Sequence, residues 1–215
     1  MSCFTPTART RIHRCAQKAN YDKAVIYPII DSILECTIAV CDSVSQRPRQ
    51  MVTTHWRVDD ALYIHGGIGS SFYKLLAAGA PVSVSLAVTD ALVLARSAFE
   101  TSINYRSVQI YGQFEAVTDR QEQLSLLERF YQNLLPGRWS EIRAPSAKEL
   151  AATYVLRLPL VEVAAKISQG EPDDKDEDLQ TPSWGGVRHY VHGWGEIQSD
   201  SLSLDLALPD SVRQL

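Results

Sequence analysis

The chain has 215 residues, enough for one substantial hydrophobic core and too few for two full domains. Hydrophobic residues make up 45% of it and charged residues 21%, as in an ordinary soluble globular protein. A net charge of -4 argues against nucleic acid or an anionic membrane surface as main partner, and no apolar run approaches the ~20 residues that cross a bilayer.

The N-terminus and the four cysteines point to the cytoplasm. The first eleven residues contain no apolar signal core, and the cysteines form no CxxC motif. Cys36 and Cys41 lie five residues apart on one predicted strand, so they should face opposite sides of it. That arrangement argues against a shared metal or a disulfide, and we expect buried, reduced thiols.

The first fifty residues predict an arm, a helix and a strand. Residues 1–20 are basic and irregular, typical of an N-terminal arm over the surface. Residues 22–32 carry apolar side chains at helical spacing behind Asp22, a suitable N-cap. Pro28 should kink this helix or shift its start. Residues 36–41 are apolar and β-branched, which predicts a strand.

The stretch around which the chain is organised is a glycine–serine turn between a strand and a helix. Residues 51–58 and 61–65 predict two strands joined by a two-residue hairpin connection. Ser70 or Ser71 can cap the following helix, which should end at Gly79.

The same turn has the features of a phosphate site. Unpaired backbone N–H groups at a helix start suit an anion, and Lys74, about one turn later, can add a charge. A plain capped turn is the alternative. The Gly67-x-Gly69 pattern lacks the third glycine of a dinucleotide fingerprint, because Phe72 stands there, and no Gly-Lys-Ser/Thr follows.

The rest of the chain predicts a mainly β, single-domain protein over residues 1–215. Alternating or short apolar runs predict five further strands, at residues 81–88, 91–95, 105–117, 155–167 and 201–208. Gly112 should mark a bulge or bend. A helix is expected at residues 119–135, and a short one after Ser146.

The predicted fold class is mainly β with α, because six or seven mostly antiparallel strands and three or four helices suggest a barrel or curled sheet closed by helices. Residues 170–181 contain an acidic, solvated loop, and residues 188–215 form a C-terminal extension.

Polar residues near the turn are candidate ligand contacts. Thr53 and Thr54 lie on the strand expected to pair with the one that leads into the turn, although strand propensity explains threonine equally well. His65 ends a strand at the turn, where a hydrogen-bonded structural histidine is the alternative. Arg106, followed by Ser107, can give a bidentate fork to phosphate or bind a nearby carboxylate.

Two further features bear on chemistry. Trp184 lies in a loop, and three roles are open for it: a packing residue, a subunit contact or a wall for a planar ligand. His189-x-x-His192 lacks a third ligand, and the nearby Gly193 and Gly195 oppose a helix, so no metal site is predicted. The sequence contains no clear nucleophile, so catalytic residues stay unassigned and a cofactor would carry any reaction.

An ordered set of motifs runs from about Arg11 to Val187: Thr53-Thr54, Leu62–Gly66, Ser70-Ser71, Lys74, Asp90–Phe99, Asn104–Val108, Gly112, Pro136–Trp139, Lys148–Thr153, Ala165-Lys166 and Trp184-Gly185. This set resembles the pyridoxamine 5′-phosphate oxidase-like FMN-binding proteins, in the flavin-nucleotide-binding branch that is similar to nitroimidazole-resistance proteins. The resemblance implies a split β-barrel that forms a homodimer, with FMN in clefts at the subunit interface.

By the same resemblance, the turn residues Gly66, Ser70, Ser71 and Lys74 would hold the FMN phosphate, with His65 near the phosphate or ribityl chain. Six other residues would contact the flavin, the last two with less support and in part from the second subunit: Thr53, Thr54, Arg106, Ser107, Lys166 and Trp184.

One departure concerns affinity. Similar proteins commonly place Arg or Lys directly after the serine of the phosphate turn, where this chain has Ser71 and Phe72. A missing charge-assisted contact costs about 1.5–3 kcal/mol of binding free energy. FMN should therefore bind more weakly, unless Lys74 and Arg96 supply the missing contact.

These features imply an FMN-dependent oxidoreductase acting on an unidentified small molecule, with NADH or NADPH as candidate electron donor. A flavin-binding module without turnover, used for storage or sensing, is the first alternative. A related barrel that holds haem or deazaflavin is the second. Pyridoxamine phosphate oxidase activity itself is not expected, because no second phosphate site is evident.

Overall fold

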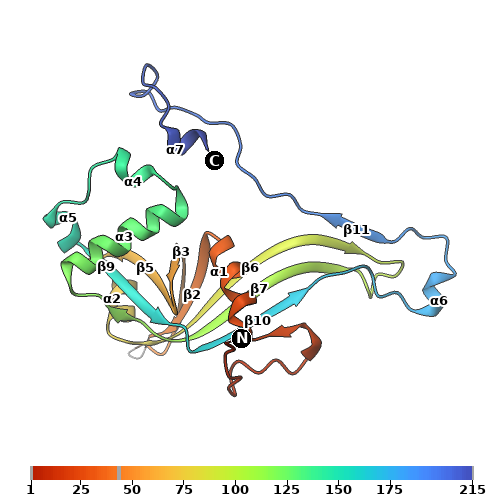
Figure 1. Cartoon of the computed structure of the whole chain (residues 1–215). Coiled ribbons are helices and arrows are strands. Elements are labelled where there is room, and N and C mark those ends of the chain that lie inside the picture. The colour runs from red at the N-terminus through yellow and green to blue at the C-terminus, as the bar shows by residue number, and fades with distance from the viewer. Residues whose placement is uncertain (1, 43–44, 215) are drawn as a thin grey trace.

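Two antiparallel sheets organise the chain (Figure 1). The structure, a computed structural model, describes residues 2–42 and 45–214. The larger sheet has the strand order β1-β10-β7-β6-β2-β3, with β11 paired to β6, and the smaller has the order β4-β5-β9-β8.

The strands of the larger sheet are β1 (Ala19–Asn20), β2 (Glu35–Cys41), β3 (Pro48–Thr54), β6 (Pro81–Leu94), β7 (Ser102–Gln113), β10 (Glu162–Ser168) and β11 (Gly186–His189). Those of the smaller sheet are β4 (Trp56–Val58), β5 (Ala61–Gly67), β8 (Glu115–Ala116) and β9 (Thr153–Pro159). The mainly β fold with added helices is as predicted.

The helices are the 3-10 turn η1 (Ala16–Lys18), α1 (Lys23–Ser32), α2 (Ser71–Ala77), α3 (Arg120–Leu134), α4 (Arg138–Glu141), α5 (Ala147–Ala151), α6 (Asp176–Leu179) and α7 (Asp210–Arg213). The four predicted helices (α1, α2, α3 and α5) begin where the sequence indicates, and η1, α4, α6 and α7 are short additions that it did not predict. The predicted N-caps Asp22, Ser70, Asp119 and Ser146 each accept a hydrogen bond from a backbone N–H in the first turn. No helix among the described residues is long and apolar enough to cross a membrane.

Two hydrophobic clusters hold the sheets and helices together. The first lies between the strands of the larger sheet and helices α1 and α2, where Val84 and Ile110 face inward as a cross-strand pair. The second lies between the smaller sheet and α3, with Trp56, Tyr63, Leu126 and Leu127 at its centre. This second cluster forms the floor of the cavity described below.

Two predicted strands are each two strands in different sheets. The run 51–58 breaks at His55, so β3 pairs with β2 while β4 pairs with β5. Thr53 and Thr54 are therefore not on the strand that pairs with β5, which corrects the prediction. The run 155–167 likewise divides into β9 and β10. The hydrophobic periodicity of the sequence shows no break at either place, because the residues that flank each break are apolar or at least half-buried.

Other strand predictions also need correction. Residues 81–88 and 91–95 belong to the single strand β6, whose register shifts between Thr89 and Ala91. Gly112 marks no bulge, because it pairs regularly with Val82. A side chain at that glycine would lie 2.9 Å from Leu158, so the position requires close packing.

The C-terminal leucines form no strand in the described chain, although their alternation predicts one. Leu202, Leu204 and Leu206 lie in turns and are exposed. No neighbouring strand of the same chain is present to receive them. The acidic segment is more ordered than predicted: Asp174 forms an ion pair with Arg96 at 2.7 Å, and its carboxylate is only 2% exposed.

The molecule has two unlike parts (Figure 1). A body contains most of the helices, the smaller sheet and most of the larger one. An outer hairpin, formed by the far ends of β6 and β7 with β11, projects from this body and has α6 at its far end. From β11 the C-terminal extension crosses back toward α4, where Ser211 on α7 bonds to Glu141. The N-terminal arm packs beneath the sheet, with Phe4 and Thr10 buried.

Candidate functional site

A cavity of about 390 Å³ lies beside His65, at the end of β5. Helix α3 contributes Phe130 and Tyr131 to its wall, and α4 contributes Trp139. Arg143, which donates two hydrogen bonds to Glu149 at 2.6 and 2.7 Å, lines the cavity as well. Flat aromatic walls with one imidazole and one guanidinium suit a planar ligand that carries an anionic group.

His65 is held by rings rather than by hydrogen bonds. Its ring centroid lies 5.1 Å from that of Phe130 and 5.8 Å from that of Trp56. Nδ1 is buried without a partner among the described residues. Nε2 has no partner there either and is not among the buried unpartnered atoms, so it faces the cavity. Burial lowers the pKa of His65 below its ordinary 6.5, which keeps the imidazole neutral and able to ligate a metal.

The glycine–serine turn is packed by Tyr73. A Cβ at Gly66 would lie 2.2 Å from the Tyr73 ring, so only glycine fits beneath it. The Tyr73 hydroxyl donates to the backbone oxygen of His65 at 2.7 Å and lies 3.1 Å from the hydroxyl of Thr53. The turn and the strand β3 are thus joined through one phenol directly behind His65.

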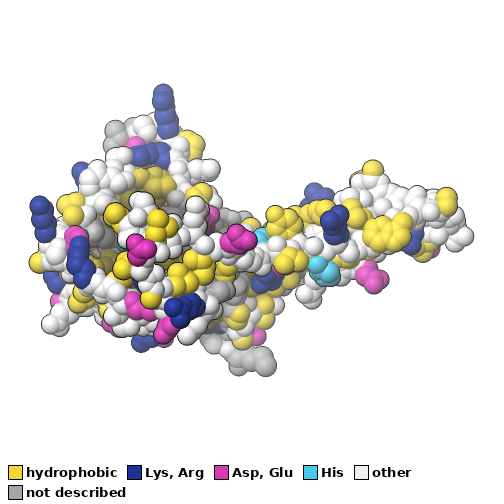
Figure 2. All heavy atoms as spheres, turned by 90° about the horizontal axis from the view of Figure 1, so that it is seen from above, with side chains coloured by type: hydrophobic (Ala, Val, Ile, Leu, Met, Phe, Trp, Pro, Cys, Tyr) yellow, Lys and Arg dark blue, Asp and Glu magenta, His cyan; other side chains and the backbone are white. Residues whose placement is uncertain are grey.

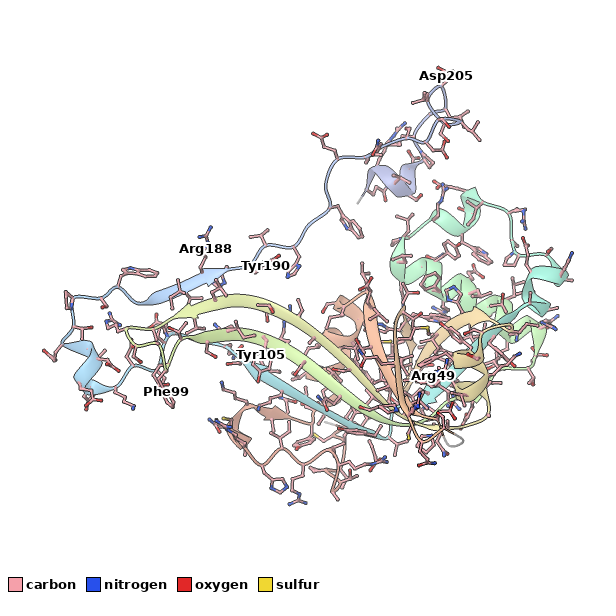
Figure 3. All side chains as sticks on the ribbon, turned by 180° about the vertical axis from the view of Figure 1, so that it is seen from behind. Arg49, Phe99, Tyr105, Arg188, Tyr190 and Asp205 are labelled. Atoms are coloured by element: carbon pink, nitrogen blue, oxygen red, sulfur yellow. The ribbon has the colours of Figure 1, made fainter. Side chains whose placement is uncertain are left out.

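Arg49, which the sequence analysis did not single out, supplies a cation at this turn (Figure 3). Its guanidinium donates to Ser71 Oγ at 3.0 Å and lies over the Phe72 ring at 5.6 Å. Lys74 is exposed on α2. The basic residue expected after the serine is therefore replaced in space by one from β3. Only the position of residue 49 at the start of that strand could have indicated it.

Arg106 lies on β7 and binds Asp90. The guanidinium donates to both carboxylate oxygens, at 2.7 and 2.9 Å, and this contact lowers the pKa of Asp90. The pair stands between two grooves of about 610 and 650 Å³, both lined by Arg106. His192 of the C-terminal extension also lines the first groove. Arg106 thus keeps its carboxylate partner and still borders open space.

Ser107 and Lys166 are cross-strand neighbours, and the Ser107 hydroxyl donates to the Lys166 carbonyl at 3.1 Å. They line a separate cavity of about 250 Å³ together with Arg9 and Arg14 of the N-terminal arm. Trp184 is 70% exposed, and its ring covers Gly186 on the outer hairpin.

The structure therefore distributes the predicted residues over several places. Gly66, Ser70, Ser71 and Thr53 come together at the turn with Arg49 and Tyr73, and Lys74 follows on α2. Thr54 lines a small cavity beside His55. The other four predicted residues lie elsewhere on the larger sheet and outer hairpin: Arg106, Ser107, Lys166 and Trp184.

Comparison with known proteins defines the class. The fold is that of the pyridoxamine phosphate oxidase-like split barrels. The model of the family described as pyridoxamine 5′-phosphate oxidase matches residues 22–167, and the chain belongs to this family. No curated protein matches the chain.

Two solved structures are similar over nearly the whole chain. The FAD and haem binding protein from Mycobacterium smegmatis is 35% identical, with 92% of this chain and 96% of that one covered and a TM-score of 0.86. The flavocytochrome Anf3 from Azotobacter vinelandii is 30% identical, with 98% of each chain covered and a TM-score of 0.91. A candidate 5-nitroimidazole antibiotic resistance protein from Bacteroides thetaiotaomicron is 18% identical, covers 69% of this chain and 86% of its own, and shares the fold with a TM-score of 0.58.

Proposed function

We propose that the protein is a redox protein that binds a flavin and a haem in one chain. The observation that carries the proposal is the His65 cavity, where a neutral imidazole points an unpartnered Nε2 between aromatic walls. The similarity to a FAD and haem binding protein and to a flavocytochrome, at 35% and 30% identity, supports it.

The residues around the cavity fit a haem. His65 would ligate the iron, Phe130, Tyr131 and Trp139 would pack against the ring, and Arg143 would pair with a propionate. Bound haem would supply one-electron iron chemistry that no side chain of this chain can supply. The protein's own contribution is the burial of His65 among aromatic rings, which keeps the imidazole uncharged.

The flavin belongs, in this proposal, on the outer surface between the turn and the Arg106 grooves. Arg49 and Lys74 would attract its phosphate groups, and the Arg106–Asp90 pair would border the ring. The family resemblance implies FMN, whereas the M. smegmatis protein is named for FAD. We favour FAD, because the whole-chain similarity to that protein is the more specific guide.

A homodimer completes the proposal. Nine of the sixteen large hydrophobic residues exposed in the described chain fall within residues 179–206, along the outer hairpin and the C-terminal extension. Figure 2 shows hydrophobic side chains gathered on the surface of the projecting part of the molecule. Exposed apolar surface of this extent marks an interaction site, and a second copy of the chain is the partner that the resemblance implies.

The test is the cofactor content of the full-length protein. We expect a Soret band together with flavin bands in the protein as purified, and the masses of FAD and haem among the molecules released on denaturation. Flavin alone would reject the haem site, and FMN in place of FAD would correct the choice of flavin. Deazaflavin, the third possibility, is separated from both by its mass.

Matched variants test the phosphate contacts. Arg49→Ala and Lys74→Ala should each weaken flavin binding about 10-fold, the value of one charge-assisted hydrogen bond. Arg129→Ala, which removes an exposed cation from α3, should leave flavin binding unchanged. Equal affinity in all three variants would remove the turn from the flavin site.

Turnover distinguishes an enzyme from a binding module. Anaerobic NADH or NADPH should bleach the bound flavin of an oxidoreductase, and colour that persists with both donors favours storage or sensing. The substrate is a small molecule of unassigned identity, and a cytoplasmic location stays a prediction from the sequence.

A further inference from the structure

Three buried nitrogens in the described chain lack hydrogen-bond partners: Nδ1 of His55, Nε1 of Trp56 and Nδ1 of His65. The Trp56 and His65 rings are in contact, and His55 directly precedes Trp56 in the chain. His55 is 7% exposed and Trp56 is 2% exposed. Buried polar atoms without partners are rare and costly in native proteins, so three on these neighbouring residues require an explanation.

A cavity of about 30 Å³ adjoins two of these three residues. His55 and Trp56 both line it, together with Thr54 and Asn133. It shares Phe130 with the His65 cavity, and Ile33 and Leu34 with the groove beside Arg106. The small cavity therefore lies in the wall between the two places to which the proposed function assigns haem and flavin.

The hydrogen-bonding roles of the two nitrogens follow from their surroundings. Nε2 of His55 lies 3.1 Å from the carbonyl oxygen of Ile30, which can only accept, so Nε2 carries the proton. The uncharged ring then presents Nδ1 as an acceptor. The indole nitrogen of Trp56 is a donor only. One group that both accepts and donates can satisfy the pair.

Water is the ligand that fits. A buried water needs at least about 10–15 Å³ of such space and two to four polar partners. The cavity exceeds that volume, and the hydroxyl of Thr54 and the amide of Asn133 line it as further partners. A larger ligand is excluded by the volume. The charged residues that also line the cavity, Asp31 and Arg57, are paired with each other at 2.6 and 3.0 Å and so leave no unbalanced charge for an ion.

We propose that an ordered water in this cavity accepts a hydrogen bond from Trp56 Nε1 and donates one to His55 Nδ1, and so fixes the indole behind His65. The ring centroid of Trp56 lies 5.8 Å from that of His65 and 5.2 Å from that of Phe130. The orientation of the indole therefore determines how it packs against the imidazole. His55 and Trp56 are positioning residues in this account. Their effect on a haem rests on the proposed function, whereas the water site does not.

The first experiment tests the water site itself. In ¹⁵N-labelled protein, the Trp56 indole proton, assigned by its loss in Trp56→Phe, should show a cross-relaxation peak to a long-lived water. The peak should persist in His55→Gln, which keeps an acceptor and an amide donor, and disappear in His55→Leu. Trp139→Phe, a change in the same ring cluster, should leave it unchanged.

A crystal structure provides the same test in cases where a variant does not fold. Density for a water within hydrogen-bond distance of both nitrogens in the wild-type protein supports the proposal. Absence of that density, with a Trp56 signal that shows no contact to water, overturns it.

The second experiment tests the positioning role with haemin as the probe. Residues that orient a metal-ligating histidine without touching the metal typically change metal affinity 10–100-fold. We therefore expect His55→Leu to weaken haemin binding at least about 10-fold and to shift the Soret maximum. His55→Gln should bind haemin with an affinity near that of the wild type. Wild-type affinity and an unshifted band in His55→Leu would overturn the role of His55. Failure of the wild-type protein to bind haemin would reject the proposed function instead, and the water measurement would still decide the site.

Discussion

The His65 cavity and the outer hairpin differ in how much of their surroundings one chain provides. Around His65, three aromatic rings, a helix pair and a buried strand are all in place. On the outer hairpin and the C-terminal extension, Val191 and Leu202 are each 88% exposed. Figure 3 shows Tyr190 and Asp205 on a segment that crosses open space before it returns to the body. In our proposal, the haem half of the site is therefore complete in the single chain, and the flavin half is completed by a second copy.

The largest expected effect is the loss of haem from the His65 cavity when its histidine is removed. His65→Ala should abolish the Soret band and leave the flavin bands, because His65 is the only histidine that lines the cavity among the described residues, and an indole nitrogen does not ligate iron. The matched control is His192→Ala on the C-terminal extension, which should keep the band. A Soret band in His65→Ala would mean that the iron is held elsewhere.

The second prediction tests the outer half. Leu202, Leu204 and Leu206 are exposed, so replacing all three with Ser should leave the fold of the chain intact. We expect the molar mass in light scattering to fall from two chains to one, with flavin lost as its interface opens. Val161→Ser, at an exposed position outside residues 179–206, should remain dimeric. A dimer with all three serines would remove the extension from the interface.

The third prediction concerns the turn between the two halves. Gly66→Ala brings a methyl group within 2.2–2.6 Å of the Tyr73 ring, and such overpacking costs about 1–3 kcal/mol of the free energy of unfolding. At Gly67 a Cβ would have nothing within 4 Å, so Gly67→Ala should change stability by about 0.5 kcal/mol or less. Denaturant unfolding compares the two, and equal midpoints would contradict the packing described here.

Sequence patterns predicted the parts of the fold that local interactions decide. The caps at Asp22, Ser70, Asp119 and Ser146 and the hairpin between β4 and β5 depend on residues a few positions apart, and all were confirmed. The breaks at His55 and near Leu160 were missed, because a chain that passes from one buried sheet to another stays apolar throughout.

The candidate site was harder to predict, because its contacts join distant residues. Arg49 reaches Ser71 across twenty-two positions, and Phe130 reaches His65 from another element. The sequence analysis named His65 as a candidate flavin contact, and its aromatic surroundings could be found only in the structure. The alternating leucines predicted a strand that the described chain does not form. Alternation indicates that one face of a segment is suited to burial, but it does not indicate which surface covers that face.

The smallest expected effect is a pH dependence inside the body. Burial lowers the pKa of His55 below its ordinary 6.5, so below about pH 6.5 the unfolded chain binds a proton that the folded chain does not. Stability should therefore fall as the pH decreases from 7.5 to 5.5. The fall should be shallower in His55→Gln, which cannot titrate. Identical slopes in thermal unfolding of the two cofactor-free proteins would show that His55 keeps its ordinary pKa.

The most direct test of the account is an anaerobic reduction followed in the visible spectrum of the full-length protein. When NADPH or a photochemical donor reduces the flavin, the flavin bands should bleach and the Soret band should then move to its ferrous position, with both changes in the same molecule. A bleached flavin beside an unmoved Soret band, or a protein without any Soret band, would contradict the claim that one chain joins the two cofactors.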